Sequence, residues 1–292
     1  SFRKLIATII AHRLDEYLVR ETGLQTQHGF SSSRGCPDAT SSLKIALEQL
    51  RYANREAFVL FVDLVKAFDS VNREMLWKIL SNMGVPDSLI KVIKKAYTDI
   101  TITGKVNGVK FDLESTSGVQ QGCPLSPVLF LFAMQAVLES MDKVWPSKKP
   151  ELHFLSSADG TPTGHISKRD NATKTDTMRP IDLYNSLFAD DAAFIFLTRE
   201  DLIEGTKCII DHFRAFGLEV HLGKHEKNGE KATKSKTEFM QFPARKRILT
   251  EGKKKATTIY ESTEADKADI TLENNRFVSW TDQFKYLGSI IH

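Results

Sequence analysis

The stretch from Phe58 to Asp69 constrains the fold of this 292-residue chain more than any other. It opens with five apolar residues, Phe-Val-Leu-Phe-Val, which run directly into a single carboxylate, Asp63. A short apolar run of β-forming residues is typical of a buried strand. A carboxylate at the end of such a strand needs a partner charge, a metal ion or a hydrogen bond to its own turn. The residues that follow have helical spacing, and Asp69 or Ser70 is suited to cap that helix.

The composition is that of an ordinary globular protein, with 41% apolar and 26% charged residues. Net charge is only +3, but residues 222–255 hold eleven Lys or Arg against four Glu. Such a segment suits either contact with a polyanion or a solvated insertion. Cys36, Cys123 and Cys208 form no Cys-x-x-Cys spacing, which argues against a disulfide framework or a zinc site and favours a reducing compartment. With no signal peptide and no run of about 18 apolar residues, we expect neither secretion nor a membrane partner, and an intracellular location.

Helical periodicity alternates with hairpin signals along the chain, which predicts an α+β fold. Apolar spacing predicts helices over 5–18, 43–50, 75–83, 87–97, 128–144 and 202–216. Asn107-Gly108, between two strand-like runs, predicts a tight hairpin. Residues 146–180 and 222–234 are expected to be insertions, and residues 243–280 are polar with few signals of order.

Two acidic features carry the chemistry: Asp63, and the adjacent pair Asp190 and Asp191 in a strand, turn, strand pattern. Adjacent acids in an otherwise apolar hairpin are costly unless a cation compensates. Carboxylates from neighbouring strands can hold two Mg²⁺ ions that stabilise the attacking and leaving oxygens of a phosphoryl transfer. Because alternate residues of a strand face opposite sides, we expect Asp63 and Asp190 to be the main ligands, with Mn²⁺ able to replace Mg²⁺.

The motifs of reverse transcriptases, and most of all those of non-LTR (LINE-type) retrotransposons, resemble a series of segments in this chain. The matching segments are His28–Gly35, Phe61–Asp69, Ser117–Pro127, Phe188–Asp191, Gly217–Leu218 with Lys236–Met240, and Phe284–Ser289. They occur in the family's order and span nearly the whole chain. The resemblance implies an RNA-directed DNA polymerase that extends a DNA primer on an RNA template with dNTPs. In that reaction the primer 3′-hydroxyl attacks the α-phosphate and pyrophosphate leaves.

The same resemblance implies a right-hand polymerase fold, with an antiparallel palm sheet backed by helices, helical and hairpin fingers, and the thumb missing. It divides the chain into a partial fingers region at 1–56, a palm at 57–242, and a polar insertion with a primer-grip-like end at 243–292. Within the palm, residues 85–116 are expected to contribute to fingers and palm. Finger sequence before Ser1 and any endonuclease domain are expected to be missing as well.

Catalytic roles follow from the resemblance for four residues. Asp63, Asp190 and Asp191 resemble the catalytic, metal-binding carboxylates of the family. Lys236 resembles the lysine proposed to protonate the pyrophosphate leaving group, although Lys231 and Lys234 lie close enough in the sequence to compete for that role.

Nucleotide binding is implied for six further residues. Phe68 would pack beneath the incoming sugar and exclude a 2′-hydroxyl, or it is a core phenylalanine. Gln121 would contact the nucleotide, or it only supports its loop, and Gly122 would let the backbone approach the template–primer. Leu64 and Val65 would offer backbone N–H groups to the triphosphate. Arg34 would clamp the triphosphate charge, although Ser31 stands where the family often has a basic residue.

The last implied site is a primer grip at Tyr286, Leu287 and Gly288. Three alternatives stay open on the sequence alone. Instead of an active reverse transcriptase, the chain could be an inactive remnant that at most binds RNA. It could also be a relative of group II intron maturases with a splicing role, or another palm polymerase that makes RNA. Phe68 and the segment Gly118–Pro127 disfavour the RNA polymerase. Nothing in the sequence indicates an oligomeric state.

Overall fold

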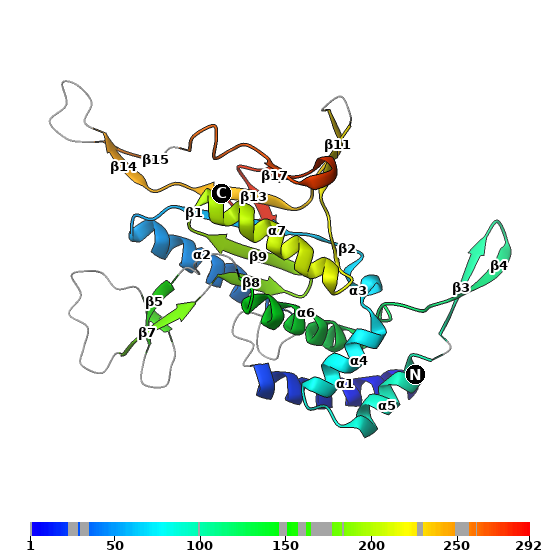
Figure 1. Ribbon diagram of the computed structural model, residues 1–292. Helices are drawn as coiled ribbons and strands as arrows, with labels where there is room; N and C mark the ends of the chain where they lie inside the picture. The colour runs from blue at the N-terminus through cyan, green and yellow to red at the C-terminus, as the bar shows by residue number, and fades with distance from the viewer. Residues whose placement is uncertain are drawn as a thin grey trace. The chain divides into compact units, whose positions relative to one another are not determined.

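The computed structural model (Figure 1) describes residues 2–22, 29, 35–98, 100–145, 151–156, 162–164, 177–182, 184–226, 230–248, 257–260 and 262–292. The chain forms two compact units. Unit 1 comprises Ser1–Arg34, Leu64–Trp145 and Cys208–Val220, and unit 2 comprises Gly35–Asp63, Pro146–Lys207 and His221–His292. Each unit is therefore assembled from three segments that are distant in the sequence.

Unit 2 is built on a mixed sheet of eight strands. They are β1 (Ala57–Val62), β8 (Asn185–Phe188), β9 (Asp191–Phe196), β11 (Gly223–His225), β12 (Lys231–Thr233), β13 (Glu238–Phe242), β16 (Ile270–Thr271) and β17 (Arg276–Trp280). The order is β12-β11-β17-β13-β1-β9-β8, with β16 paired to β17. β1 is antiparallel to both β9 and β13, whereas β13 and β17 run parallel. β1 therefore lies inside the sheet, and all six of its residues are buried.

Both faces of this sheet are covered, which explains why β1 shows an unbroken apolar run instead of alternation. On one face, α2 (Cys36–Tyr52) packs with Val59 and Phe61 of β1 in a single apolar cluster. On the other, α7 (Arg199–Ala215) lies close to β9, because a Cβ built on Gly205 would come within 2.1 Å of the ring of Phe196. Figure 1 shows the two helices along the sheet strands.

Smaller pieces complete unit 2. They are the three-stranded sheet of β5 (Glu151–Ser156), β6 (Pro162–Gly164) and β7 (Thr177–Asp182), the pair β14 (Arg245–Ile248) and β15 (Thr257–Tyr260), the 3₁₀ turn η1 (Glu273–Asn275), and the hairpin of β18 (Phe284–Tyr286) and β19 (Ser289–Ile291). The β18–β19 hairpin joins the α2 side of the core through Tyr286 and Ile291.

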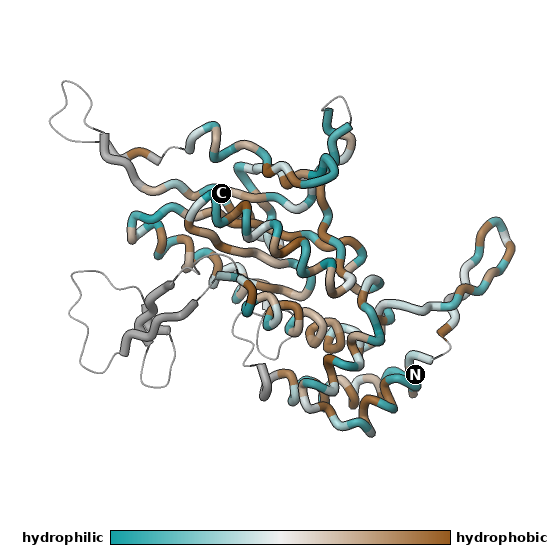
Figure 2. The backbone as a smooth tube through the Cα atoms, in the orientation of Figure 1, coloured by the Kyte–Doolittle hydropathy of each residue, from teal (hydrophilic) through white to brown (hydrophobic). Residues whose placement is uncertain are grey.

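Unit 1 is mainly helical. It contains α1 (Phe2–Thr22), α3 (Ala67–Ser70), α4 (Arg73–Asn82), α5 (Asp87–Ala96), α6 (Ser126–Asp142), the end of α7, and the strand pairs β2 (Leu64–Val65) with β10 (Glu219–Val220) and β3 (Thr101–Val106) with β4 (Val109–Glu114). α1 and α4 both pack on α6, most of whose residues are apolar and buried. Figure 2 shows hydrophobic and hydrophilic residues alternating along the β3–β4 hairpin, in contrast to the more uniformly hydrophobic α6.

The predicted α+β fold, with a central sheet backed by helices, is confirmed. The Asn107-Gly108 hairpin is also confirmed, since both residues have positive φ, 50° and 86°, as a two-residue turn of this kind requires. The fingers and palm boundaries stay predictions. In the described residues, no helix is long and apolar enough to cross a membrane.

Two local predictions are wrong. Neither Asp69 nor Ser70 caps the helix after β1, because these residues form the single turn α3 and the chain then extends through Val71. Asn72 is the cap of α4, and its side chain accepts a hydrogen bond from the backbone N–H of Met75 at 3.0 Å. The expectation of little order over 243–280 also fails, because Arg276–Trp280 is a strand of the main sheet, with Phe277 and Val278 buried.

Candidate active site

Asp63 directly follows β1. Its backbone forms hydrogen bonds with two residues that lie between β10 and β13 in the sequence. Its N–H donates to Thr237 Oγ1 at 3.2 Å, and its carbonyl oxygen accepts from the N–H of His221 at 2.8 Å. The side chain is left 37% exposed at the end of an otherwise buried strand. The backbone hydrogen bonds hold the residue in place, and its carboxylate remains available to other groups.

Asp190 and Asp191 lie at the tight connection between β8 and β9. Ala189 and Asp190 form the two-residue turn, and Asp191 is the first residue of β9, opposite Phe188. Ala189 has φ of 58°, an uncommon conformation for a residue other than glycine. The prediction of strand, turn, strand is confirmed, with the correction that only the first acid is in the turn.

The strand register brings Asp63 and Asp191 to the same end of the sheet. The last pair between β1 and β9 is Val62 with Ala192, so the next residue on each strand is one of these two acids. Loss of surrounding water, followed by repulsion from Asp190 and then from Asp63, raises the pKa of the Asp191 carboxyl from 3.8 to about 6. The three carboxylates therefore interact electrostatically, as the sequence predicts for a cation site.

Lys236 is the lysine that lies beside the acids. Its Nζ is 4.0 Å from Asp63 Oδ2, and its side chain is 66% exposed. The two rival lysines pair elsewhere, Lys231 with Asp269 at 2.6 Å and Lys234 with Glu238 at 3.8 Å. The structure thus distinguishes three lysines that the sequence could not.

These carboxylates do not form a ready-made metal centre. In the part of the chain that the structure describes, no group of three or more His, Cys, Asp or Glu side chains gathers closely enough to hold a metal ion. The chemistry of the acids nevertheless fits a hard divalent cation, because carboxylate oxygens are its preferred ligands, and desolvation together with repulsion from Asp190 and Asp63 raises the pKa of Asp191.

The residues expected to bind the nucleotide lie in unit 1. Phe68 is half-buried, and its ring stacks on that of Phe130, with centroids 4.6 Å apart and an interplanar angle of 15°. Gln121 and Gly122 are exposed, and a Cβ on Gly122 would meet nothing within 4 Å, so the backbone there is open to a close approach. Leu64 and Val65 form β2, whose pairing with β10 uses part of their hydrogen-bonding capacity. Arg34 and Ser31 lie outside the described residues.

The predicted primer grip divides into a core residue and a turn. Tyr286 is 2% exposed, its hydroxyl donates to the carbonyl oxygen of Ser186 at 3.0 Å, and burial raises its pKa. Leu287 and Gly288, with φ of 50° and 82°, form the turn between β18 and β19. Tyr286 therefore anchors the hairpin in the core of unit 2, and the turn is the part of the segment that can face a primer.

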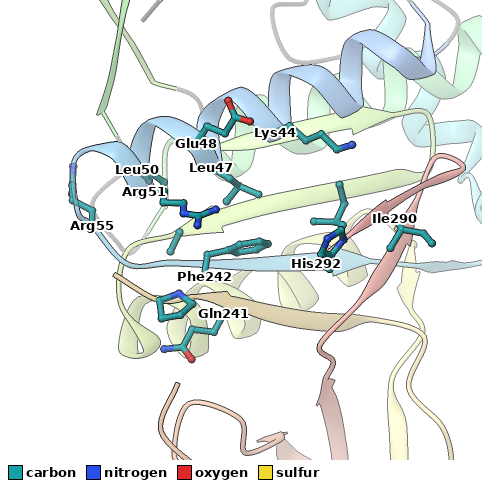
Figure 3. Close-up of a pocket in the computed structure, with 13 residues that line it drawn as sticks. Lys44, Leu47, Glu48, Leu50, Arg51, Arg55, Gln241, Phe242, Ile290 and His292 are labelled. Atoms are coloured by element: carbon teal, nitrogen blue, oxygen red, sulfur yellow. The ribbon is translucent and has the colours of Figure 1, made fainter. Parts of the chain in front are cut away.

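A pocket in unit 2 is separate from the acids (Figure 3). It has a volume of about 430 Å³ and is lined by Arg51 of α2, Ala57 at the start of β1 and Phe242 at the end of β13. Asp63 follows the opposite end of β1, six residues and thus roughly 20 Å along an extended strand. This pocket takes no part in the carboxylate site.

Comparison with known proteins identifies the family. The model of the family described as "Reverse transcriptase (RNA-dependent DNA polymerase)" matches residues 2–291. The retrovirus-related Pol polyprotein from type-2 retrotransposable element R2DM of Drosophila melanogaster is 28% identical over 118 residues, 39% of this chain and 11% of that protein. The corresponding polyprotein from type-1 retrotransposable element R2 of Nasonia vitripennis is 29% identical over 134 residues, 46% of this chain and 13% of that protein.

This chain therefore spans a small part of the curated relatives it matches, which are Pol polyproteins of R2 non-LTR retrotransposons. Among solved structures, telomerase from Candida tropicalis in complex with a fragment of telomeric RNA has a TM-score of 0.51 at 13% identity, covering 84% of this chain and 34% of that one. That likeness shows a shared fold. The match across residues 2–291 goes further: the chain belongs to the reverse transcriptase (RNA-dependent DNA polymerase) family.

Proposed function

We propose that this chain carries the nucleotidyl-transfer centre of an RNA-directed DNA polymerase, which extends a DNA primer along an RNA template with dNTPs. The observation that supports it is the meeting of Asp63, Asp190 and Asp191 at one end of the central sheet, with Lys236 beside Asp63. Membership of the reverse transcriptase family supports the choice of RNA as template and of dNTPs as substrates.

Two divalent cations, Mg²⁺ or Mn²⁺, suit this set of acids. Asp63 and Asp190 would hold them, with Asp191 as the third carboxylate. When bound, such ions stabilise negative charge on the attacking and leaving oxygens of the phosphoryl transfer. The chain itself supplies neighbouring negative charges, and desolvation together with repulsion from Asp190 and Asp63 raises the pKa of Asp191. A bound cation would relieve that repulsion.

The other residues would orient the substrates and handle a proton. Lys236, whose Nζ is 4.0 Å from Asp63 Oδ2, would donate a proton to the departing pyrophosphate. The ring of Phe68, kept rigid by stacking on Phe130, would obstruct a ribose 2′-hydroxyl and so select dNTPs. The exposed Gln121 would contact the incoming nucleotide, and the Leu287–Gly288 turn would touch the primer. Cys36, Cys123 and Cys208 are free, which supports a reducing intracellular site of action, and we propose the nucleus.

A second candidate is a domain that binds RNA without catalysis. The observation in its favour is that the described residues contain no ready-made cluster of metal ligands. In this case the three acids would retain their positions but bind metal too weakly for turnover.

Primer extension on an RNA template with dNTPs and Mg²⁺ separates the two candidates. Asp63→Asn and Asp190→Asn should each lower the extension rate by about a hundredfold to a thousandfold, the scale on which lost electrostatic stabilisation acts. Asp282→Asn, which removes an exposed carboxylate elsewhere in unit 2, is the matched control and should extend at the normal rate. A wild-type chain that retains the RNA in a gel-shift assay but never extends a primer would favour the binding domain.

A further inference from the structure

Arg73, the first residue of α4, makes an extensive set of contacts that the sequence did not predict. Its guanidinium donates four hydrogen bonds to one turn, Ser115–Gly118. The acceptors are the carbonyl oxygens of Ser115, Ser117 and Gly118 and the hydroxyl of Ser115, with the bonds to Ser117 and Gly118 at 2.9 Å and 2.8 Å. All four are neutral oxygens, so this is a clamp on the backbone and not an ion pair.

The clamped turn packs directly against the segment that contains Phe68. The N–H of Gly118 donates to the carbonyl oxygen of Val71 at 2.9 Å, and the N–H of Val119 donates to that of Phe68 at 2.8 Å. A Cβ on Gly118 would lie 2.6 Å from Cα and O of Asp69, and φ of Gly118 is 74°. Glycine permits this close approach, Ser117 Oγ donates to the carbonyl oxygen of Asp69 at 3.3 Å, and Arg73 holds the turn in place from α4.

The far end of the same loop is held by a second contact. Ser126 Oγ donates to the carbonyl oxygen of Gln120 at 2.6 Å and lies 3.2 Å from the hydroxyl of Tyr97. The guanidinium of Arg73 lies over the Tyr97 ring, 5.2 Å from its centroid. Arg73 and Tyr97 therefore link both ends of the loop that presents Gln121, from Ser115–Gly118 on one side to Gln120 and Ser126 on the other.

We propose that Arg73 is a positioning residue for nucleotide selection, which holds the loop bearing Gln121 in a fixed register with Phe68. The proposal rests on the function proposed above, since it assigns Phe68 and Gln121 to the incoming nucleotide. The hydrogen bonds of Arg73 go to Ser115, Ser117 and Gly118, so Arg73 would act on selection through the backbone of residues 115–119. A lysine cannot replace it, because a compact ammonium lacks the planar fork of donors that reaches these separate carbonyl groups.

Steady-state primer extension with Arg73→Gln and Arg73→Lys tests the proposal. For both variants we expect KM for dNTP to rise at least about tenfold and the preference for dNTP over rNTP to fall by a similar factor, the equivalent of one charge-assisted hydrogen bond. Lys78→Gln removes one exposed positive charge from the same helix and is the control, with wild-type values expected. If only kcat falls, in proportion to the folded fraction, Arg73 is merely structural and the proposal is wrong.

Amide hydrogen exchange provides an independent test of the clamp. In Arg73→Gln the N–H groups of Gly118 and Val119 should exchange at least about tenfold faster, because their partners Val71 and Phe68 are no longer held in place. Unchanged protection would overturn the clamp itself. Failure of the proposed function would show differently. The wild-type chain would then extend no primer, and the role of Arg73 in nucleotide selection would be wrong as well, whatever the exchange rates.

Discussion

The β3–β4 and β8–β9 hairpins both have two-residue turns, but the residue types in the two turns differ. The turn between β3 and β4 is Asn107-Gly108, and both residue types tolerate the positive φ that each adopts. The turn between β8 and β9 is Ala189-Asp190, and Ala189 adopts φ of 58° without the freedom of glycine. A left-handed conformation costs an alanine about 1–2 kcal/mol.

The surroundings of the two turns explain the difference. Every residue of β4 is exposed, so the β3–β4 hairpin depends on its own turn. β9 is paired on both sides, by β1 and β8, and five of its six residues are buried. The sheet can therefore enforce a strained turn, and the strain falls next to the acids that we assign to catalysis. Strain of this kind at a functional site persists only where the rest of the structure imposes it.

The most severe test of this contrast places proline in both turns. Proline fixes φ near −65°, which neither Ala189 nor Asn107 can accept. Ala189→Pro should lower the free energy of unfolding by on the order of 3 kcal/mol, because the break falls in the buried sheet. Asn107→Pro should lower it by less than about 1 kcal/mol, because the β3–β4 hairpin can open locally. Urea denaturation followed by circular dichroism measures both, and equal losses would remove the distinction between the hairpins.

The third two-residue turn, Leu287-Gly288, adds a hairpin that is anchored by a side chain. Tyr286→Phe deletes the hydroxyl that donates to the Ser186 carbonyl oxygen and should cost about 1 kcal/mol of stability, the usual value for a buried hydrogen bond. KM for the primer should stay at the wild-type value, since the hydroxyl lies inside the core. Weaker primer binding at unchanged stability would instead place Tyr286 in contact with the primer.

Gly108→Ala in the β3–β4 turn and Ala189→Gly in the β8–β9 turn should change stability in opposite directions. Gly108→Ala forces a side chain into φ of 86° and should destabilise the β3–β4 hairpin by about 1 kcal/mol, measured by hydrogen exchange across its strands. Ala189→Gly relieves strain but frees the unfolded chain, so we expect a net gain of about 0.5 kcal/mol in urea denaturation. The extension rate of Ala189→Gly should fall, because the relaxed turn no longer fixes Asp190. A loss of stability in both variants would mean that Ala189 is not strained.

The same contrast separates what the sequence could predict from what it could not. The strand before Asp63 and the Asn107-Gly108 turn follow from local patterns, because apolar runs and turn residues act over a few positions. The family motifs identified the three acids.

The structure was required wherever a residue acts over a long separation. Arg73 reaches a turn more than 40 residues away, and only the fold shows that Lys236, and not Lys231 or Lys234, lies beside Asp63. β17 was missed for a similar reason: its apolar pair Phe277 and Val278 is short, and it is stabilised by its place in the sheet beside β13.

The smallest expected effect is a dependence of stability on pH that belongs to the acidic turn alone. The pKa of Asp191 is about 6 in the folded chain against 3.8 for a free side chain, so the folded state binds the proton more tightly than the unfolded state. Asp191 thus favours folding at low pH, and this contribution is lost as pH rises through 6. Asp191 is exposed, so solvent screening should hold the change below about 1 kcal/mol.

Thermal denaturation between pH 3.5 and 7.5, compared with Asp191→Asn, measures this effect as the difference in Tm between the two proteins at each pH. Removal of the carboxylate should raise Tm relative to wild type at pH 7.5 and leave little difference at pH 3.5, below both pKa values, while Asp282→Asn controls for the loss of one acid. Added Mg²⁺ should narrow the gap at pH 7.5, because a cation at the acids favours the ionised carboxyl and stabilises the folded state by mass action. If the difference in Tm between wild type and Asp191→Asn stays constant over this pH range, the three carboxylates do not act on one another. The β8–β9 turn would then differ from the β3–β4 turn in backbone strain but not in electrostatics.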